Sequence, residues 1–283
     1  MMIDGPDALS GVLRAVSFML LLNAAGIPIF IAVFGGLTPK SLLDVRKLGW
    51  RLAIGALVFV TAHQALEAAR MAGEMSGIVD PAMQKMALLS PGGAAFALRI
   101  VGLALVAVGL RRGSALPLLG TLLTITSFTL VGHTTTTPDR AAAAALIILH
   151  LLVVAFWLGS LWPLYITAAN EQPPITARVI DKFSTAATWL VPLILLAGVG
   201  LMALLLPSLA TFKQPYGQLL LAKMAGFAVL MALASLNKWR FGPACAAGDT
   251  AAFKRTVVIE YVLICAVLAI TAAMTMFYSP EPG

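Results

Sequence analysis

The chain has 283 residues, of which 60% are hydrophobic and only 11% are charged. Soluble domains carry about 45–50% apolar and about 25% charged residues, so this composition excludes an ordinary water-exposed globular protein. With a mean hydropathy of +0.95, the chain is expected to lie in a lipid bilayer. A net charge of +7 would suggest nucleic acid as the partner of a soluble protein. Because no exposed domain carries a basic cluster, we expect no nucleic-acid binding.

Long apolar stretches follow one another along the whole chain, and each is close to the roughly 20 residues that a spanning helix needs. Ala and Leu dominate them without strand alternation, which favours helices over a barrel. We therefore predict an all-α polytopic membrane protein, a bundle of eight transmembrane helices that forms a single integral membrane domain over residues 1–283. The predicted spans are approximately 11–36, 50–70, 93–110, 114–132, 141–168, 183–206, 217–239 and 256–278.

The basic residues predict the orientation of this bundle, because loops rich in Lys and Arg stay in the cytoplasm. The even-numbered connections hold only Arg70, Lys85, Arg140 and Lys213. We therefore expect both termini on the extracytoplasmic side. The odd-numbered connections hold most of the basic residues: Lys40, Arg46, Lys47, Arg51, Arg111, Arg112, Arg178, Lys182, Lys238, Arg240, Lys254 and Arg255.

All three histidines of the chain fall in or beside predicted spans. From its place in the second span, His63 is expected roughly 20 Å from the cytoplasmic end, and His150 roughly 15 Å below the outer end of the fifth. His133 caps the outer end of the fourth span. Ionisable groups inside spans are candidate functional residues, and three neutral imidazoles can complete a copper or zinc site. The alternative is that each histidine only hydrogen-bonds a neighbouring helix.

The second span carries two further candidate ligands. Glu67 and Met71 follow His63 at i+4 and i+8, so the three side chains are expected close to one helical face, leading outward. A carboxylate and a thioether beside an imidazole would form an entry path for a metal ion. The alternative is an ion pair between Glu67 and a cation within the membrane: Arg14, Arg99 or Lys223.

The methionines favour copper as the metal. The chain has 12 methionines, and beyond the first two almost all are predicted on the outer side, several of them between residues 71 and 86. Thioether sulfur selects Cu(I) over hard cations, although Met is also ordinary apolar filler. The oxidation state, Cu(I) or Cu(II), stays open. Trp157 follows His150 by seven residues. It either lines the metal site or only packs between helices.

No sequence motif provides for an energy source or a catalytic centre. There is no GxxxxGK[ST] loop, no HExxH helix and no GxSxG elbow. We therefore expect no enzyme activity and no use of ATP, so that any transport is passive or driven by a gradient.

The later spans resemble the CopD/PcoD family of copper-resistance membrane proteins. The resemblance covers about residues 130–243, and the first third of the chain is similar in topology more than in motif. Two positions depart from the usual pattern: four threonines follow Gly132-His133, and Lys238 stands where Arg is more usual. The matching segments are Gly132-His133, His150 with Trp157 and Gly159, Phe183-Ser184, Gly198, Tyr216-Gly217 with Lys223, and Asn237 to Arg240.

This resemblance implies a bacterial inner-membrane protein that handles copper, often with a periplasmic CopC-like copper carrier as partner. The matching motifs contain His133, His150, Trp157 and Lys223, so the resemblance implies these as site residues. His63, Glu67 and Met71 are candidates from their residue type and spacing alone. Two other functions stay open. One is a membrane cytochrome with His63 and His150 as axial ligands of a b-type haem. The other is a copper-insertion or assembly factor that binds the metal without moving it.

Overall fold

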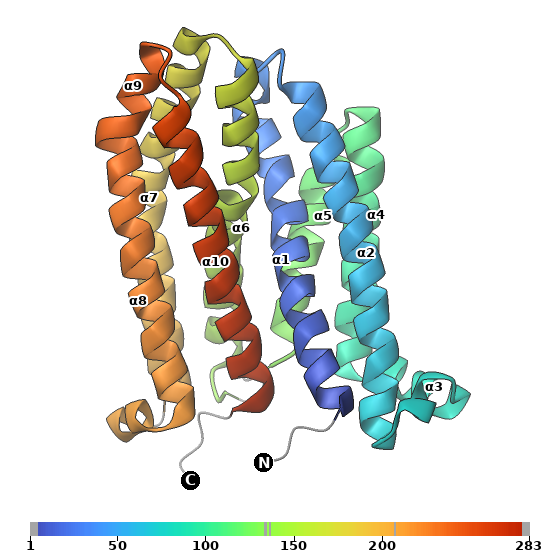
Figure 1. Cartoon of the computed structure of the whole chain (residues 1–283). Coiled ribbons are helices and arrows are strands. Elements are labelled where there is room, and N and C mark those ends of the chain that lie inside the picture. The colour runs from blue at the N-terminus through green and yellow to red at the C-terminus, as the bar shows by residue number, and fades with distance from the viewer. Residues whose placement is uncertain (1–4, 133–134, 136, 207, 279–283) are drawn as a thin grey trace.

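The computed structural model describes residues 5–132, 135, 137–206 and 208–278, which are helical with short connections and contain no strand. The chain runs up and down through a bundle of roughly antiparallel helices (Figure 1). In chain order the elements are α1 (Gly5–Phe34), η1 (Gly35–Leu37), α2 (Leu42–Ala72), η2 (Met75–Ile78), α3 (Pro81–Leu89), α4 (Pro91–Arg112), α5 (Leu116–Thr126), η3 (Ser127–Leu130), α6 (Arg140–Asn170), α7 (Pro173–Leu205), η5 (Leu209–Lys213), α8 (Pro215–Leu236), the π-helical η6 (Asn237–Phe241), α9 (Gly242–Ala246) and α10 (Ala251–Phe277).

Local signals in the sequence account for several helix ends. The side chains of Asp80, Ser90 and Asp139 accept hydrogen bonds from backbone N–H groups in the first turns of α3, α4 and α6, as N-cap residues do. At the other end, Gly73 and Gly113 follow α2 and α4 with φ of 75° and 67°, a left-handed conformation that glycine adopts at little cost.

The helices extend beyond the apolar segments predicted from the sequence. The largest difference is at α7, which begins at Pro173 instead of near residue 183. Its first turns carry Arg178, Asp181 and Lys182 and so read as a polar connection. A helix continues through such residues because its backbone hydrogen bonds do not depend on apolar side chains.

Seven helices of the described chain are long and apolar enough to cross a membrane. The fourth predicted span, 114–132, corresponds to a shorter apolar helix over residues 116–130, so the predicted count of eight spans is not confirmed. The Ser127 hydroxyl bonds to the Thr124 carbonyl at 2.6 Å where the helix tightens into η3, and Gly132 follows with φ of 90°. Eleven α-helical and four 3-10 residues rise only about 24 Å, less than the ~30 Å hydrocarbon core.

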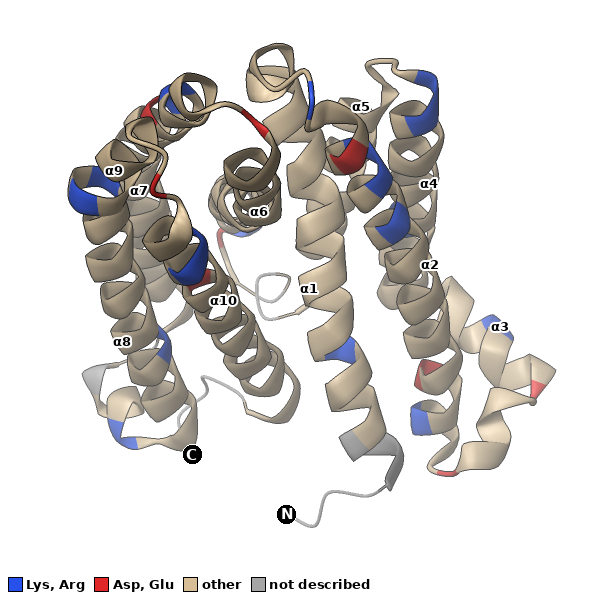
Figure 2. Cartoon of the chain, turned by 45° about the horizontal axis from the view of Figure 1, so that its top comes forward, with Lys and Arg blue, Asp and Glu red and all other residues tan. Residues whose placement is uncertain are grey.

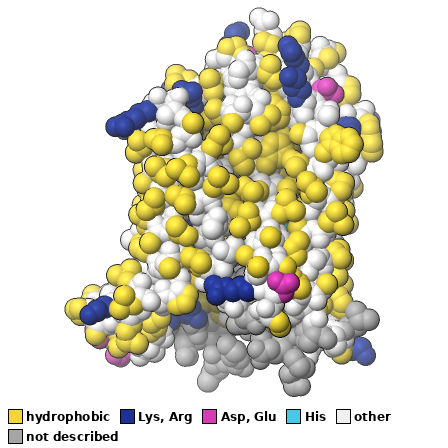
Figure 3. Space-filling model, turned by 180° about the vertical axis from the view of Figure 1, so that it is seen from behind, with side chains coloured by type: hydrophobic (Ala, Val, Ile, Leu, Met, Phe, Trp, Pro, Cys, Tyr) yellow, Lys and Arg dark blue, Asp and Glu magenta, His cyan; other side chains and the backbone are white. Residues whose placement is uncertain are grey.

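The two ends of the bundle differ in charge. We call the end at the bottom of Figure 1, where α1 begins and α10 ends, the lower end, and the opposite end the upper end. Most Lys and Arg residues lie around the upper end (Figure 2), and hydrophobic side chains cover the middle of the face in Figure 3. This pattern fits a bundle that crosses a bilayer. That the upper end faces the cytoplasm stays a prediction of the positive-inside rule.

α1 lies at the centre of the bundle and packs on both halves of the chain. One buried cluster joins Leu21 and Ala24 of α1 to α2 and α4, and a larger one joins Leu22 and Phe30 to α6, α7 and α10. The contact with α6 is closest at two glycines, because a Cβ on Gly26 would lie 1.8 Å from the Ala155 carbonyl oxygen and one on Gly159 2.5 Å from the Gly26 backbone. No residue with a side chain fits there without moving the helices apart.

We predict that Gly26→Ala destabilises the protein, whereas Gly198→Ala does not. The new methyl group of Gly26→Ala overlaps the α6 backbone, and overpacking of this kind costs about 1–3 kcal/mol or more. Gly198 has no atom within 4 Å of the corresponding Cβ position, and alanine is the better helix former. Thermal unfolding in detergent should give a lower Tm for Gly26→Ala alone. Equal Tm values for the two variants would refute this packing.

Candidate functional site

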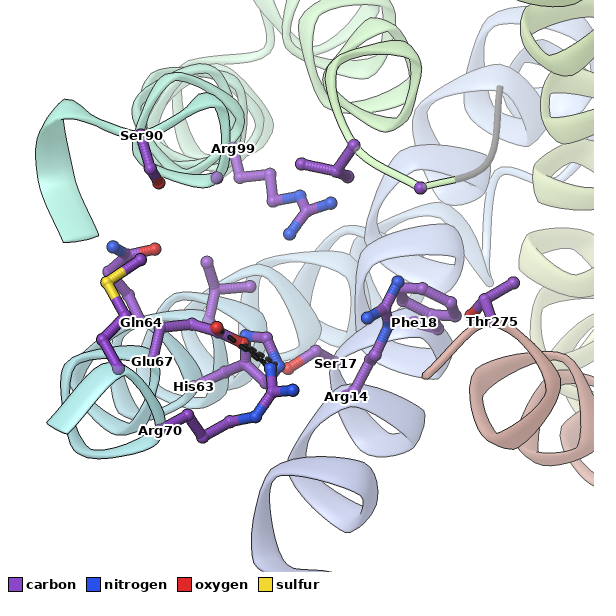
Figure 4. Close-up of a pocket in the computed structure, with 15 residues that line it drawn as sticks. Arg14, Ser17, Phe18, His63, Gln64, Glu67, Arg70, Ser90, Arg99 and Thr275 are labelled. Carbon is purple, nitrogen blue, oxygen red and sulfur yellow. Dashed lines mark hydrogen bonds and ion pairs between the residues drawn. The ribbon is translucent and has the colours of Figure 1, made fainter. Parts of the chain in front are cut away.

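A cavity of about 210 Å³ opens near the lower end of the bundle, between α1, α2 and α4. We call it the lower cavity. Figure 4 shows labelled side chains from α1, α2 and α4 around a common space, together with Thr275 of α10. It is lined by Arg14, Ser17, Phe18, Val60, His63, Gln64, Glu67, Arg70, Met71, Ser90, Gly92, Arg99, Val131, Gly132 and Thr275.

The three candidate ligands of the second span all line the lower cavity, as their helical spacing predicts. The His63 Nε2 atom lies 3.6 Å from Glu67 Oε1 and 3.5 Å from the hydroxyl of Ser10 on α1. Met71 lies one turn beyond Glu67, and 46% of its surface is exposed. The imidazole is therefore the deeper group and the thioether the more accessible one.

Glu67 makes its ion pair with a residue of its own helix. The guanidinium of Arg70 donates to both carboxylate oxygens of Glu67 at 3.0 Å. The expected partners were Arg14, Arg99 or Lys223; the first two line the same cavity without pairing with Glu67, and Lys223 is on α8 at the far side of the bundle (Figure 1). Arg70 fits at i+3, a spacing that brings side chains together on a helix.

The three histidines are not seen together in the described chain. His133 lies outside the described residues, although its neighbour Gly132 lines the lower cavity. His150 is on α6 and does not line that cavity; it lies against the backbone of Ile194 on α7 and interacts electrostatically with Lys223 on α8. Its Nδ1 atom is buried without a hydrogen-bond partner. No group of three or more His, Cys, Asp or Glu side chains with metal-binding geometry occurs among the described residues.

Trp157 belongs to a second polar site, near the upper end. Its indole N–H donates to Glu260 on α10 at 3.3 Å, and the Asn237 amide donates to the other oxygen of this carboxylate at 2.7 Å. The Thr256 hydroxyl in turn donates to the side-chain amide oxygen, Oδ1, of Asn237. Glu260 is 2% exposed, and no cation pairs with it within the described residues. Trp157 therefore orients a buried carboxylate. No contact between Trp157 and a histidine is seen among the described residues to support its other predicted role, lining a histidine site.

Glu260 is not among the site residues predicted from the sequence. Its signal was present, since the residue lies inside the predicted span 256–278 and a carboxylate within a span is a functional candidate by default. Its two partners are also the Trp and Asn of the segments that resemble the CopD/PcoD pattern. The polar contact joins α6, η6 and α10, which are far apart in the sequence.

Comparison with known proteins gives two matches to family models. The model described as copper resistance protein D matches residues 177–274, and the model of the copper resistance protein D-like N-terminal domain matches residues 2–140. Together they cover most of the chain. No curated protein and no solved structure matches it.

We predict that Trp157→Phe lowers the stability of the folded protein. The change keeps the aromatic bulk but leaves one oxygen of a buried carboxylate without its donor, which costs about 1–2 kcal/mol. Trp189→Phe on α7 is the matched control, because Trp189 is 76% exposed and surface changes usually stay within about 0.5 kcal/mol. The measurement is thermal unfolding in detergent. If both variants unfold at the wild-type Tm, the bond to Glu260 contributes nothing.

Proposed function

Because this chain belongs to the copper resistance protein D family, we propose that it binds copper at the lower end of its bundle and moves it across the bacterial inner membrane. The observation that carries this proposal is that His63, Glu67 and Met71 line one cavity. The lower end then faces the periplasm, as the distribution of Lys and Arg predicts. The chain acts as a transporter and not as an enzyme, and it uses no ATP.

The ligand chemistry of the lower cavity suits copper. Imidazole nitrogen binds both common oxidation states of the metal, and thioether sulfur selects Cu(I). Met71 is near the accessible rim, and Met75 and Met86 in the adjoining η2 and α3 are about half exposed. We propose that these thioethers receive copper, from solution or from a periplasmic carrier of the CopC type, and pass it to His63. Glu67 supplies negative charge beside the imidazole, although Arg70 shares that charge.

His133 and His150 have different places in this proposal. Because Gly132 lines the lower cavity, His133 is one residue away from it along the chain and is the best candidate for a second imidazole. His150 lies on α6, outside the lower cavity, and we propose that it binds copper at a later step of the path. Lys223 and Trp157 then have supporting roles.

The two alternative functions receive less support from the geometry. A b-type haem with His63 and His150 as axial ligands needs both imidazoles to face one haem-sized space, and only His63 lines the lower cavity. An assembly factor that binds copper without moving it would use the same ligands, so it differs from a transporter only in flux. A Soret band in the purified protein would support the haem alternative, whereas a colourless protein that binds stoichiometric copper would exclude it.

We predict that His63→Ala weakens copper binding by the purified protein at least tenfold, because it removes the deepest ligand of the lower cavity. Metal analysis after equilibrium dialysis measures the effect. His150→Ala is the comparison: if His150 binds copper only at a later step, that variant keeps the affinity of the first site. Loss in both variants would instead support one shared site. Unchanged affinity in His63→Ala would contradict the proposal.

A further inference from the structure

Two arginines of the lower cavity form no salt bridge with a carboxylate of the described residues. Neither Arg14 on α1 nor Arg99 on α4 makes an ion pair within the described part of the chain. Arg99 donates from Nε to the Ser127 hydroxyl at 3.0 Å. Both guanidinium groups lie in membrane-spanning helices, where an uncompensated charge is costly and usually marks a functional site.

The two guanidinium groups are held in place by a pair of packed rings. The Arg14 guanidinium carbon lies 5.5 Å from the centre of the Phe18 ring, and that of Arg99 lies 5.0 Å from the Phe128 ring. The two rings pack on each other with centroids 5.2 Å apart. Cation–π contacts of this kind orient a guanidinium without neutralising it. Both charges therefore remain available to a ligand.

Charge and unused hydrogen-bonding groups in the lower cavity favour an anion. With His63 neutral, three arginines and one glutamate line the cavity, and Glu67 is already bound by Arg70. Ser17 and Gln64 also line it, and the Ser17 hydroxyl and the Gln64 amide nitrogen are buried without a hydrogen-bond partner. Unsatisfied buried polar groups in a native protein need an explanation such as a missing ligand or ion.

We infer that the lower cavity contains an anion site, in which Arg14 and Arg99 bind a carboxylate or phosphate group and Ser17 and Gln64 donate to the same ligand. Guanidinium groups form strong, geometrically specific hydrogen bonds with such oxyanions. The N-terminus of α4 adds favourable potential, because Gly92 in its first turn lines the cavity.

The size of the lower cavity limits the source of the anion. Its volume of about 210 Å³ holds a phosphate or carboxylate group with a few waters, at about 30 Å³ per water, but not a whole phospholipid. The group is therefore either a free small anion or the headgroup of an anionic lipid whose tails stay outside. This site goes beyond the proposed copper function and does not depend on it. Its occupancy would reduce the positive charge that a copper ion meets beside His63.

The test is the Tm of purified, delipidated protein in a neutral detergent, with sodium phosphate or sodium acetate replacing a bulky inert salt at constant ionic strength. A ligand that binds only the folded state raises Tm as its concentration rises. We expect a saturable rise in the wild type, loss of the rise in Arg99→Gln and partial recovery in Arg99→Lys, which keeps the charge. Arg112→Gln at the exposed upper end of α4 is the control and should respond as the wild type does.

A second arm identifies the source. Protein in phosphatidylcholine nanodiscs is compared with protein in nanodiscs that also contain phosphatidylglycerol. A rise in Tm with phosphatidylglycerol alone, lost in Arg99→Gln, identifies a lipid headgroup, and a rise with phosphate or acetate identifies a free anion. If Arg99→Gln does not fold, Arg14→Gln replaces it. Equal responses in wild type and the arginine variants, or no response to any of these anions, would overturn the inference.

Discussion

The contact between α1 and α6 at Gly26 and Gly159 holds the two halves of the bundle together. The backbones meet so closely that neither position has room for a Cβ, as is common where small residues allow membrane helices to approach. α1 also presents Arg14 to the lower cavity, and α6 presents Trp157, two residues from Gly159, to Glu260. The lower cavity and the Glu260 site therefore each take one of their residues from this pair of helices.

The two polar sites have opposite chemical character. At the lower cavity an imidazole, a thioether and the guanidinium groups of Arg14 and Arg99 surround open space, which suits a ligand that enters from outside. Near the upper end the Glu260 carboxylate is enclosed by Trp157 and Asn237 and is 2% exposed. Burying a charged group in a membrane is costly. The charged groups of each site must therefore be stabilised by neighbouring hydrogen-bond donors or be retained for a function. The proposed copper path begins at the first of them.

Much of this arrangement follows from the sequence, because the apolar length of each segment fixes where a helix can cross a bilayer. The spacing of His63, Glu67 and Met71 likewise fixes one face of α2, and the lower cavity confirms it. Other features depend on how helices are rotated against one another, which single-sequence patterns do not encode. Depth in the membrane suggested that His63 and His150 converge, yet the two face different helices. The burial of Glu260 between α6, η6 and α10 depends on the same packing, whereas Arg70 is a local partner of Glu67, three residues along the same helix.

The central claim is that this chain moves copper across a membrane through the lower cavity. The most direct test is copper flux into proteoliposomes that contain the purified protein and no ATP, measured by metal analysis of the washed vesicles. The account predicts uptake that requires the protein, proceeds without ATP and falls sharply in His63→Ala. Tight copper binding without any flux would contradict it and would leave a copper-binding assembly factor as the better description.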